Sequence, residues 1–266
     1  MNAGTLYLVP CTLGDSDPSS VLPQATLDLL RRLECFVAEE PKSARAFLKR
    51  AGIGRPLREV RIEALNQHTD RRTLPGLLQP LLEGVDLGVL SEAGYPAVAD
   101  PGAELVALVQ ERGLRVIPLV GPSSLLLALA ASGLNGQGFC FHGYLPVKAD
   151  HRAARIGELE ARSRLEGTAQ IFIETPYRNN QLLTALLAVL RADTRLCIAS
   201  ELTLTGETVR TMTVECWRAR IPDLDRKPTV FLLQAFQRSP AGSATADGER
   251  QPEEAGSRRR RLLTGG

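Results

Sequence analysis

The stretch LSEAGYPAVADPG, residues 90–102, decides how the surrounding chain folds. An apolar run typical of a buried strand, residues 86–90, leads into it, and an apolar run typical of a helix, residues 103–112, follows it. Two glycines, two prolines, Glu92 and Asp100 make the connection both stiff and polar. Ligands of open parallel sheets bind beyond the carboxyl ends of the strands. We therefore expect a strand–loop–helix unit whose loop binds a ligand.

Strand and helix patterns alternate on both sides of this loop through the first half of the chain, which predicts parallel βαβ units. The expected strands are residues 5–10, 34–38, 59–64, 86–90 and 114–120. The expected helices are residues 23–33, 44–51, 73–82, 103–112 and 123–132.

The pattern changes near residues 136–143, and FCFHGYLP, residues 139–146, is interpreted as a break between two domains. Beyond it, the strands mostly follow one another, which indicates hairpin-like pairing and a mixed sheet. The expected helices are residues 152–165 and 179–191, and the expected strands are residues 170–173, 195–200, 207–214 and 229–236. We therefore expect an α/β fold class, with an N-terminal domain over residues 1–138 and a C-terminal domain over residues 139–237.

From residue 238 onward, Ser, Gly, Glu, Arg and Pro dominate the sequence. Such a composition cannot bury enough apolar surface to fold, so residues 238–266 are expected to form a disordered tail. Its four arginines at residues 258–261 are interpreted as solvated, with contact to phosphates as the alternative.

Composition narrows the classes of protein to consider. The chain has 266 residues, 44% of them apolar, and a net charge of only +2, unlike a dedicated nucleic-acid binder. Nucleic acid stays open as a substrate. Five cysteines without C-x-x-C spacing indicate neither a disulfide framework nor a metal site. Four of the five lie in apolar, strand-like runs, where a reduced cysteine behaves as a small hydrophobe, so a cytoplasmic protein is expected. Neither a signal peptide nor an apolar run of membrane-spanning length is found in the sequence.

Two further loops follow expected strands, VPCTLGD at residues 9–15 and VGPSS at residues 120–124. Each combines Gly or Pro with small hydroxyl side chains. Ser123 and Ser124 stand at a helix start, where a hydroxyl group and free N–H groups are available. Three such loops predict a cleft lined by backbone and suited to a flat, polar small molecule.

The familiar catalytic motifs are missing from the sequence. It has no G-x-x-x-x-G-K-[ST], H-E-x-x-H or G-x-S-x-G, and GLNGQG at residues 133–138 has the wrong glycine order for a dinucleotide fingerprint. The three histidines are scattered, and His142, in an apolar run, is interpreted as a packed residue rather than a catalyst.

Six motifs occur in one order over residues 4–236. They are GTLYLVPCTLGD (4–15), SEAGYPAVADPG (91–102), PLVGPSS (118–124), FHGYLP (141–146), ETPYR (174–178) and SELTLTGE (200–207). The chain resembles the tetrapyrrole-methylase superfamily of S-adenosylmethionine-dependent enzymes. Within it, the chain is most similar to the ribosomal RNA small-subunit 2′-O-methyltransferase I family. The resemblance implies two α/β domains, a methyl donor in the cleft between them, ribosomal RNA as acceptor, and a homodimer.

The resemblance also assigns residues to the donor and the acceptor. The backbone from Gly94 to Val98 would hold the methionine part and ribose of the donor, and residues 10–14 would form the floor where the acceptor meets the methyl group. The residues implied at the donor site are Pro10, Thr12, Gly14, Glu92, Ala93, Gly94, Tyr95, Pro96, Val98, Ser123, Ser124, Glu174, Leu202, Thr229 and Val230.

The chain departs from the family pattern at four places. Residues 39–42 replace an acidic-Asp-Thr-Arg segment, Glu92 replaces an Asp, Tyr95 replaces a Thr, and residues 200–204 read SELTL instead of Arg-Glu-Leu-Thr-Lys. The missing cations are those expected to contact RNA. A ribose hydroxyl is a poor nucleophile until its proton is removed, so a general base is expected. The candidate bases are Glu39, Glu40, Glu92 and Glu174.

Three functions remain open at this point. The first is a methyltransferase acting on RNA. The second is a methyltransferase acting on a small molecule such as a tetrapyrrole-like macrocycle, for which the near-neutral charge leaves room. The third is a donor-binding protein without catalysis, which Leu204 in place of a lysine would permit.

Overall fold

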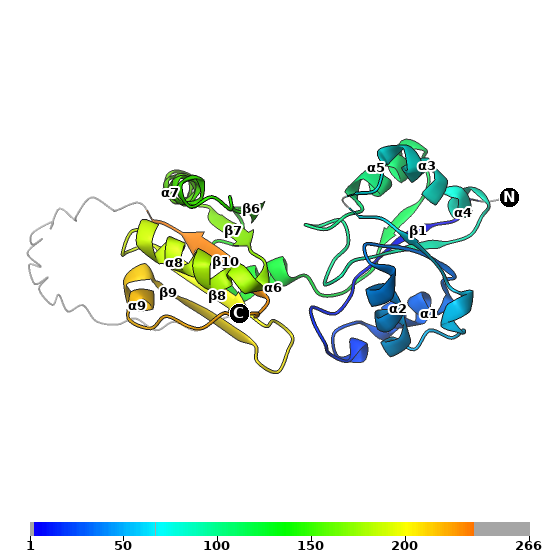
Figure 1. The fold of residues 1–266 in the computed structure, drawn as a ribbon, viewed down its shortest axis with the longest axis horizontal. Coiled ribbons are helices and arrows are strands. Elements are labelled where there is room, and N and C mark those ends of the chain that lie inside the picture. The colour runs from blue at the N-terminus through cyan, green and yellow to red at the C-terminus, as the bar shows by residue number, and fades with distance from the viewer. Residues whose placement is uncertain (1–2, 67, 237–266) are drawn as a thin grey trace, which may run out of the picture. The chain divides into compact units, whose positions relative to one another are not determined.

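The computed structural model describes residues 3–66 and 68–236 and contains two five-stranded sheets (Figure 1). The expected tail at residues 238–266 lies outside the described residues. Within the described ranges, no helix combines the length and the apolar character that a membrane crossing requires.

The first sheet is entirely parallel, with strand order β3-β2-β4-β1-β5. Its strands are β1 (Leu6–Val9), β2 (Cys35–Ala38), β3 (Arg61–Ala64), β4 (Leu87–Leu90) and β5 (Val116–Pro118). Each was expected from the sequence within a few residues. Neighbouring strand residues face opposite sides, since Phe36 packs into one apolar cluster and Val37 into another. Both faces of this sheet are therefore buried, as parallel sheets require.

The helices of the first half are α1 (Gln24–Arg32), α2 (Pro41–Arg50), α3 (Leu74–Leu77), α4 (Gln79–Leu82), α5 (Ala103–Glu111) and α6 (Ser124–Ser132). Short 3-10 turns lie at η1 (Pro18–Ser20), η2 (Leu57–Glu59) and η3 (Arg71–Thr73). The single helix expected over residues 73–82 is wrong, because the segment forms two short helices that meet at Leu78. Pro80 has no N–H to donate to the carbonyl four residues before it, so the first helix cannot continue unbroken through it.

The second sheet is mixed, with strand order β6-β7-β10-β8-β9. Its strands are β6 (Phe139–Tyr144), β7 (Ala169–Ile173), β8 (Arg195–Ser200), β9 (Thr208–Thr213) and β10 (Thr229–Gln234). Strands β6 and β7 run parallel, and the other pairs are antiparallel. The expected mixed sheet is thus confirmed.

Most of the segment interpreted as a break, residues 139–146, forms the edge strand β6, which was not expected from the sequence. Its register against β7 shifts between Phe141 and Tyr144, and Gly143 has a φ of 64°. This irregularity removes the regular alternation by which a sequence reveals a strand.

The helices of the second half are α7 (Ala149–Glu166), α8 (Asn179–Val189) and α9 (Val214–Arg218), with a 3-10 turn at η4 (Pro176–Arg178). Helix α9 was not expected; the hydroxyl oxygen of Thr213 caps it by accepting from the Cys216 amide at 3.3 Å. Phe172 and Phe231 pack into the large apolar cluster beneath α7 and α8, while α6 packs against strands β8, β9 and β10.

Candidate functional site

The sheet order brings together the three loops that the sequence singled out. They follow β4, β1 and β5, which are adjacent strands in the order β4-β1-β5. Because these strands are parallel, their loops leave the same edge of the sheet. The loops at residues 9–15 and 91–102 lie about 80 residues apart along the chain, and the loop at residues 120–124 follows about 30 residues later. They become neighbours because their strands pair side by side in the sheet.

Direct contacts fix the three loops to one another. The Cys11 amide and the Ser91 hydroxyl both donate to the Gly94 carbonyl oxygen, at 2.7 and 3.0 Å. A Cβ atom on Gly121 would lie 2.2 Å from Cγ of Pro10, so only glycine permits this close approach. These contacts make one rigid floor from residues distant in sequence.

The loop at residues 91–102 holds an unusual backbone conformation. Gly94 has a φ of 75°, and two alanines, Ala97 and Ala99, have φ values of 63° and 64°. A left-handed conformation costs a non-glycine residue roughly 1–2 kcal/mol. Such conformations persist only where the surroundings impose them, and they cluster at ligand sites.

A first cavity of about 490 Å³ opens over this floor. Residues from both sheets line it, with Glu174, Leu202 and Thr229 contributed by the second half. The residues expected from the sequence that line the first cavity are Glu92, Ala93, Gly94, Tyr95, Val98, Ser123, Ser124, Glu174, Leu202, Thr229 and Val230. Leu13, from the floor expected at residues 10–14, also lines it, and the lining residues that sequence reasoning missed are Ala99, Asp100, Leu125, Tyr144, Ile173, Pro176, Ala199 and Pro228. Asp100 was visible in the quoted loop, as a carboxyl group between two glycines.

Two further cavities adjoin the first. The second cavity, about 720 Å³, is lined by Thr12, Gly14, Asp15, Ser43, Ala46, Phe47, Lys49, Arg50, Ser91 and Glu92. The third cavity, about 910 Å³, includes Glu39, Arg71, Glu92, Asp100, Glu104 and Tyr144 in its lining. Glu92 lines all three cavities and therefore lies at their junction.

The remaining expected residues lie elsewhere. Thr12 and Gly14 line the second cavity, whereas Pro10 and Pro96 line none of the three. Glu40 also lies outside all three cavities, and its carboxylate caps α2 by accepting from the Lys42 amide at 3.0 Å. We therefore assign Glu40 a structural role in place of the catalytic one considered from the sequence.

The walls shared by the first and third cavities are acidic. Burial, followed by the nearby charges of Glu39 and Glu92, raises the pKa of Asp100 to about 6. Burial and Glu92 also raise the pKa of Glu39. The arrangement favours a ligand that brings positive charge into the first cavity, because a cation would stabilise these carboxylates in their ionised form.

The fully buried side chain of Glu174 has two different oxygen environments. Its Oε1 accepts from the Arg178 guanidinium at 2.5 Å and from the Thr175 amide at 2.7 Å. Its Oε2 is buried and has no hydrogen-bond partner among the described residues. A buried carboxylate oxygen left unpaired is costly, so a ligand that donates to it would be stabilised. The Arg178 ion pair fixes the Glu174 side chain through Oε1 and leaves Oε2 available to a ligand.

The helix start at α6 offers further unused polar groups. Ser123 is the N-cap residue, yet its hydroxyl makes no capping hydrogen bond. The N–H groups of the first turn of a helix have no partner within the helix. Both Ser123 and Ser124 line the first cavity, so the start of α6 lies at its wall.

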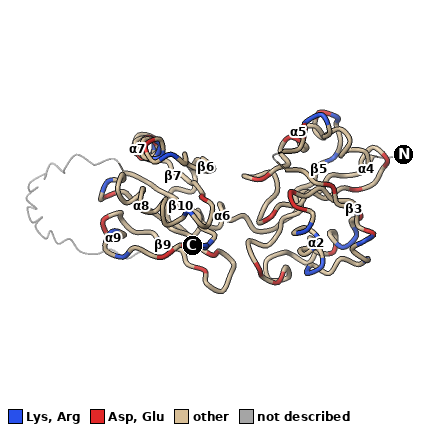
Figure 2. Tube along the Cα trace, viewed as in Figure 1, with Lys and Arg blue, Asp and Glu red and all other residues tan. Residues whose placement is uncertain are grey.

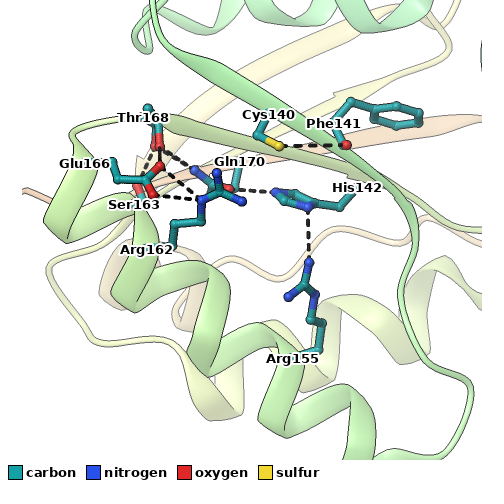
Figure 3. Close-up of polar contacts among 9 residues, drawn as sticks. All are labelled: Cys140, Phe141, His142, Arg155, Arg162, Ser163, Glu166, Thr168 and Gln170. Carbon is teal, nitrogen blue, oxygen red and sulfur yellow. Dashed lines mark hydrogen bonds and ion pairs between the residues drawn. The ribbon is translucent and has the colours of Figure 1, made fainter.

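His142 lies outside the three cavities and belongs to a polar cluster between β6 and α7 (Figure 3). Its Nε2 contacts Oε1 of Gln170 at 2.6 Å, and Arg155 donates to its Nδ1 at 3.2 Å. Burial lowers the pKa of His142, which favours the neutral ring that this pair of contacts requires. These contacts support the interpretation of His142 as a packed residue. Across the described part of the chain, no group of three or more His, Cys, Asp or Glu side chains is arranged to hold a metal ion.

Comparison with known proteins identifies the architecture. The family model for Tetrapyrrole (Corrin/Porphyrin) Methylases matches residues 5–216. The ribosomal RNA small subunit methyltransferase I of Escherichia coli O157:H7 is 34% identical over 206 residues, covering 77% of this chain and 68% of the relative. The protein of the same name from Pseudomonas aeruginosa is 32% identical over 252 residues, covering 94% and 85%.

Solved structures share the fold. The methyltransferase CobJ matches with a TM-score of 0.57 and 17% identity, over 88% of this chain and 94% of that chain. A conserved hypothetical protein from Aeropyrum pernix K1 matches with a TM-score of 0.60 and 18% identity, over 88% and 85%. The ordered motifs, the two sheets and the match over residues 5–216 agree, and the chain belongs to the tetrapyrrole (corrin/porphyrin) methylase family.

Proposed function

We propose that this chain is an S-adenosylmethionine-dependent methyltransferase that methylates a ribose 2′-oxygen of small-subunit ribosomal RNA. One observation supports it most: three loops from adjacent parallel strands form a single floor beneath the first cavity. The names of the relatives support ribosomal RNA as the acceptor. An RNA acceptor of this kind also implies a cytoplasmic enzyme. The proposal includes the division into domains at residues 1–138 and 139–237.

The residues of the first cavity fit the donor. Its volume of about 490 Å³ lies within the range of about 300–1,000 Å³ for small-molecule sites. Gly94 lets the backbone approach closely, and Ser123 offers a hydroxyl group that the helix does not use. Oε2 of Glu174 is an unpaired acceptor for an ammonium or hydroxyl group. Asp100 lines the same cavity and would bring negative charge to a sulfonium bound there.

When bound, the donor supplies a methyl group already activated by its attachment to a positively charged sulfur. The chain's own contribution is alignment, which the fixed loops provide. Glu92 lies at the junction of the first and second cavities, and we assign it as the base that takes the proton of the acceptor hydroxyl. Asp100 contributes negative charge on the donor side.

The third cavity disfavours the small-molecule alternative. It adjoins the first through Glu92, Ala99, Asp100 and Tyr144 and, at about 910 Å³, is large enough for a bulky acceptor. Its lining carries the carboxyl groups of Glu39, Glu92, Asp100 and Glu104, and its Arg71 is paired with Glu104. Tetrapyrrole acceptors bear carboxylates, which this lining would repel.

We also propose that the chain forms a homodimer. Helix α6 has the sequence SLLLALAAS, which contains no charged residue, although part of it faces solvent. A surface helix normally carries a polar face, and an exposed apolar face indicates an interface.

Incubation of the protein with a transcript of small-subunit ribosomal RNA and methyl-labelled donor tests the function. After digestion to nucleosides, the label should appear in one 2′-O-methylnucleoside. Glu92→Gln should lower kcat by about 10²–10⁴-fold with little change in donor affinity. Glu40→Gln is the matched control, and should leave kcat unchanged.

Three other outcomes would count against the proposal. Label in a methylated base would show that the acceptor atom is wrong. Donor binding without any labelled RNA would contradict the RNA acceptor. Equal kcat values for the two glutamate variants would remove Glu92 as the base.

A further inference from the structure

The second cavity lies at the same edge of the first sheet as the donor loops. Thr12 and Gly14 follow β1, Ser91 and Glu92 follow β4, and the opposite wall comes from α2. It shares the Glu92 carboxylate with the first cavity. A group held in the second cavity therefore lies beside both the proposed base and the donor.

Helix α2, which forms the wall, is strongly cationic. Its sequence PKSARAFLKR contains Lys42, Arg45, Lys49 and Arg50 and no acidic residue. All four side chains are exposed. The Lys and Arg segments of α2 appear in blue in Figure 2. In a chain of net charge +2, this local excess of four positive charges is a distinct feature.

The two cations within the second cavity are free to bind an anion. The Lys49 ammonium group forms no hydrogen bond or ion pair with any described residue. Arg50 is paired only with Asp15, whose side chain is 98% exposed. An exposed pair of this kind is worth about 0–1 kcal/mol, so a phosphate group can replace Asp15 at little cost.

We propose that Lys49 and Arg50 form a phosphate subsite for the acceptor RNA, so that the strand enters over the last turn of α2. This inference rests on the proposed function and extends it to the direction of RNA entry. A phosphate held at this turn would bring a neighbouring ribose toward Glu92 and the floor at Thr12 and Gly14.

The pattern of charge along α2 favours a nucleic-acid strand over a small anion. Lys42, Arg45 and Lys49 are spaced at i, i+3 and i+7, so they lie along one side of the helix. They span about 10 Å, at about 1.5 Å per residue. Lys42 and Arg45 do not line the second cavity, so a compact acceptor would leave them unused, whereas an extended polyanion would contact them.

The matched control lies at the opposite edge of the same sheet. Arg32 ends α1, as Lys49 and Arg50 end α2, and it is also exposed. It lines a separate cavity with Glu34 and Asp86, which precede β2 and β4. Arg32→Gln therefore removes one cation from a helix end at the amino-terminal edge of the strands, away from the donor loops.

The experiment measures binding of a small-subunit ribosomal RNA transcript by wild type, Lys49→Gln, Arg50→Gln and Arg32→Gln over a series of salt concentrations. Lys49→Gln and Arg50→Gln should each weaken binding several-fold and reduce the slope of log K against log salt by about 1. Arg32→Gln should match wild type. Calorimetric affinity for S-adenosylmethionine and the melting temperature should stay within error for all variants.

Each failure has a separate meaning. If wild type binds the transcript and all three variants bind equally well, the subsite on α2 is wrong and the proposed function stands. If wild type binds S-adenosylmethionine but not the transcript, both the subsite and the RNA acceptor are wrong. If Lys49→Gln impairs binding of a carboxylated tetrapyrrole instead, the subsite takes that acceptor and the RNA assignment fails.

Discussion

Asp100 is the residue through which the charge of the first cavity depends most directly on pH. Its pKa of about 6 means that it is mostly ionised at pH 7 and mostly protonated at pH 5. Glu39, Glu92 and Tyr144 are the other titratable groups facing it. A positively charged donor binds the ionised form better, so affinity for S-adenosylmethionine should fall by about tenfold from pH 7 to pH 5. Calorimetric titration over this range measures the change.

Two comparisons isolate Asp100 as the cause. Asp100→Asn should flatten the pH dependence of donor affinity, and S-adenosylhomocysteine, which lacks the sulfonium charge, should show a smaller dependence than the donor.

The stability of the fold should also depend on the ionisation of Asp100. Since the folded-state pKa lies above the unfolded value of 3.8, ionisation of Asp100 destabilises the fold. Stability should thus fall as pH rises from about 4 to about 6, and Asp100→Asn should remove that loss. A donor affinity that does not change between pH 5 and 7 would contradict this role.

Gly94 combines a left-handed backbone with a position inside the first cavity. A Cβ there would lie 2.9 Å from Cδ2 of Leu13, another lining residue. Gly94→Ala should lower the free energy of unfolding by about 1–2 kcal/mol and weaken donor binding tenfold or more. Denaturant unfolding and calorimetry measure the two effects.

Gly113 supplies the control for Gly94. It has a φ of 64°, and a Cβ added there would meet nothing within 4 Å. Gly113→Ala should therefore cost a similar free energy of unfolding through backbone strain alone and leave donor affinity unchanged. Equal donor affinities for the two alanine variants would mean that Gly94 does not face the donor.

At the scale of elements, the loop between β8 and β9 connects the second sheet with the acceptor floor. Glu201 and Thr203 have φ values of 53° and 66°, and the Thr203 amide donates to the Glu207 carboxylate at 2.6 Å. This shape places the Leu204 side chain against Gly14, where an added Cβ would lie 2.8 Å from Cδ1 of Leu204. Leu204 therefore contacts a residue of the second cavity.

Leu204→Lys tests whether this loop contacts RNA. The family pattern implies a lysine at this position, and an ammonium group near Gly14 would add a cation beside the second cavity. The variant should bind the RNA transcript more tightly and increase the salt slope by about 1. Salt-dependent binding isotherms measure it, with Leu165→Lys, an exposed position on α7, as the control. The same gain in both variants would show only non-specific attraction.

The sequence pattern predicted most of the helices and strands. It missed elements whose structure depends on contacts with distant parts of the chain. Buried strands such as β4 were evident because every residue of the strand is apolar or glycine and all four are buried. The edge strand β6 was missed because its bulge and half-exposed residues hide the alternation of apolar and polar residues.

For the site, loop chemistry and family resemblance together predicted eleven lining residues of the first cavity. Sequence spacing alone does not indicate that Tyr144 or Pro228 lies there, because sheet pairing between distant strands brings them in.

At the scale of the whole molecule, an exposed apolar surface supports the proposed dimer. Val120 is 71% exposed, and Leu126 and Leu127 on α6 are 57% and 39% exposed. The first turn of the same helix lines the first cavity through Ser124 and Leu125. Burial of this surface against a second copy would remove apolar area from water and would hold the helix start that faces the donor.

Leu126→Glu should convert the dimer into a monomer at micromolar concentration, because a charged group buried in an apolar interface lacks a partner. Leu165→Glu is the matched control: Leu165 is 77% exposed on α7, and its replacement should leave the dimer intact. Analytical ultracentrifugation measures the mass, and melting curves show that both variants are folded. A monomeric wild type, or two variants with the same mass, would contradict an interface on α6. If the interface also supports the helix start, the monomeric variant should bind S-adenosylmethionine more weakly than the control.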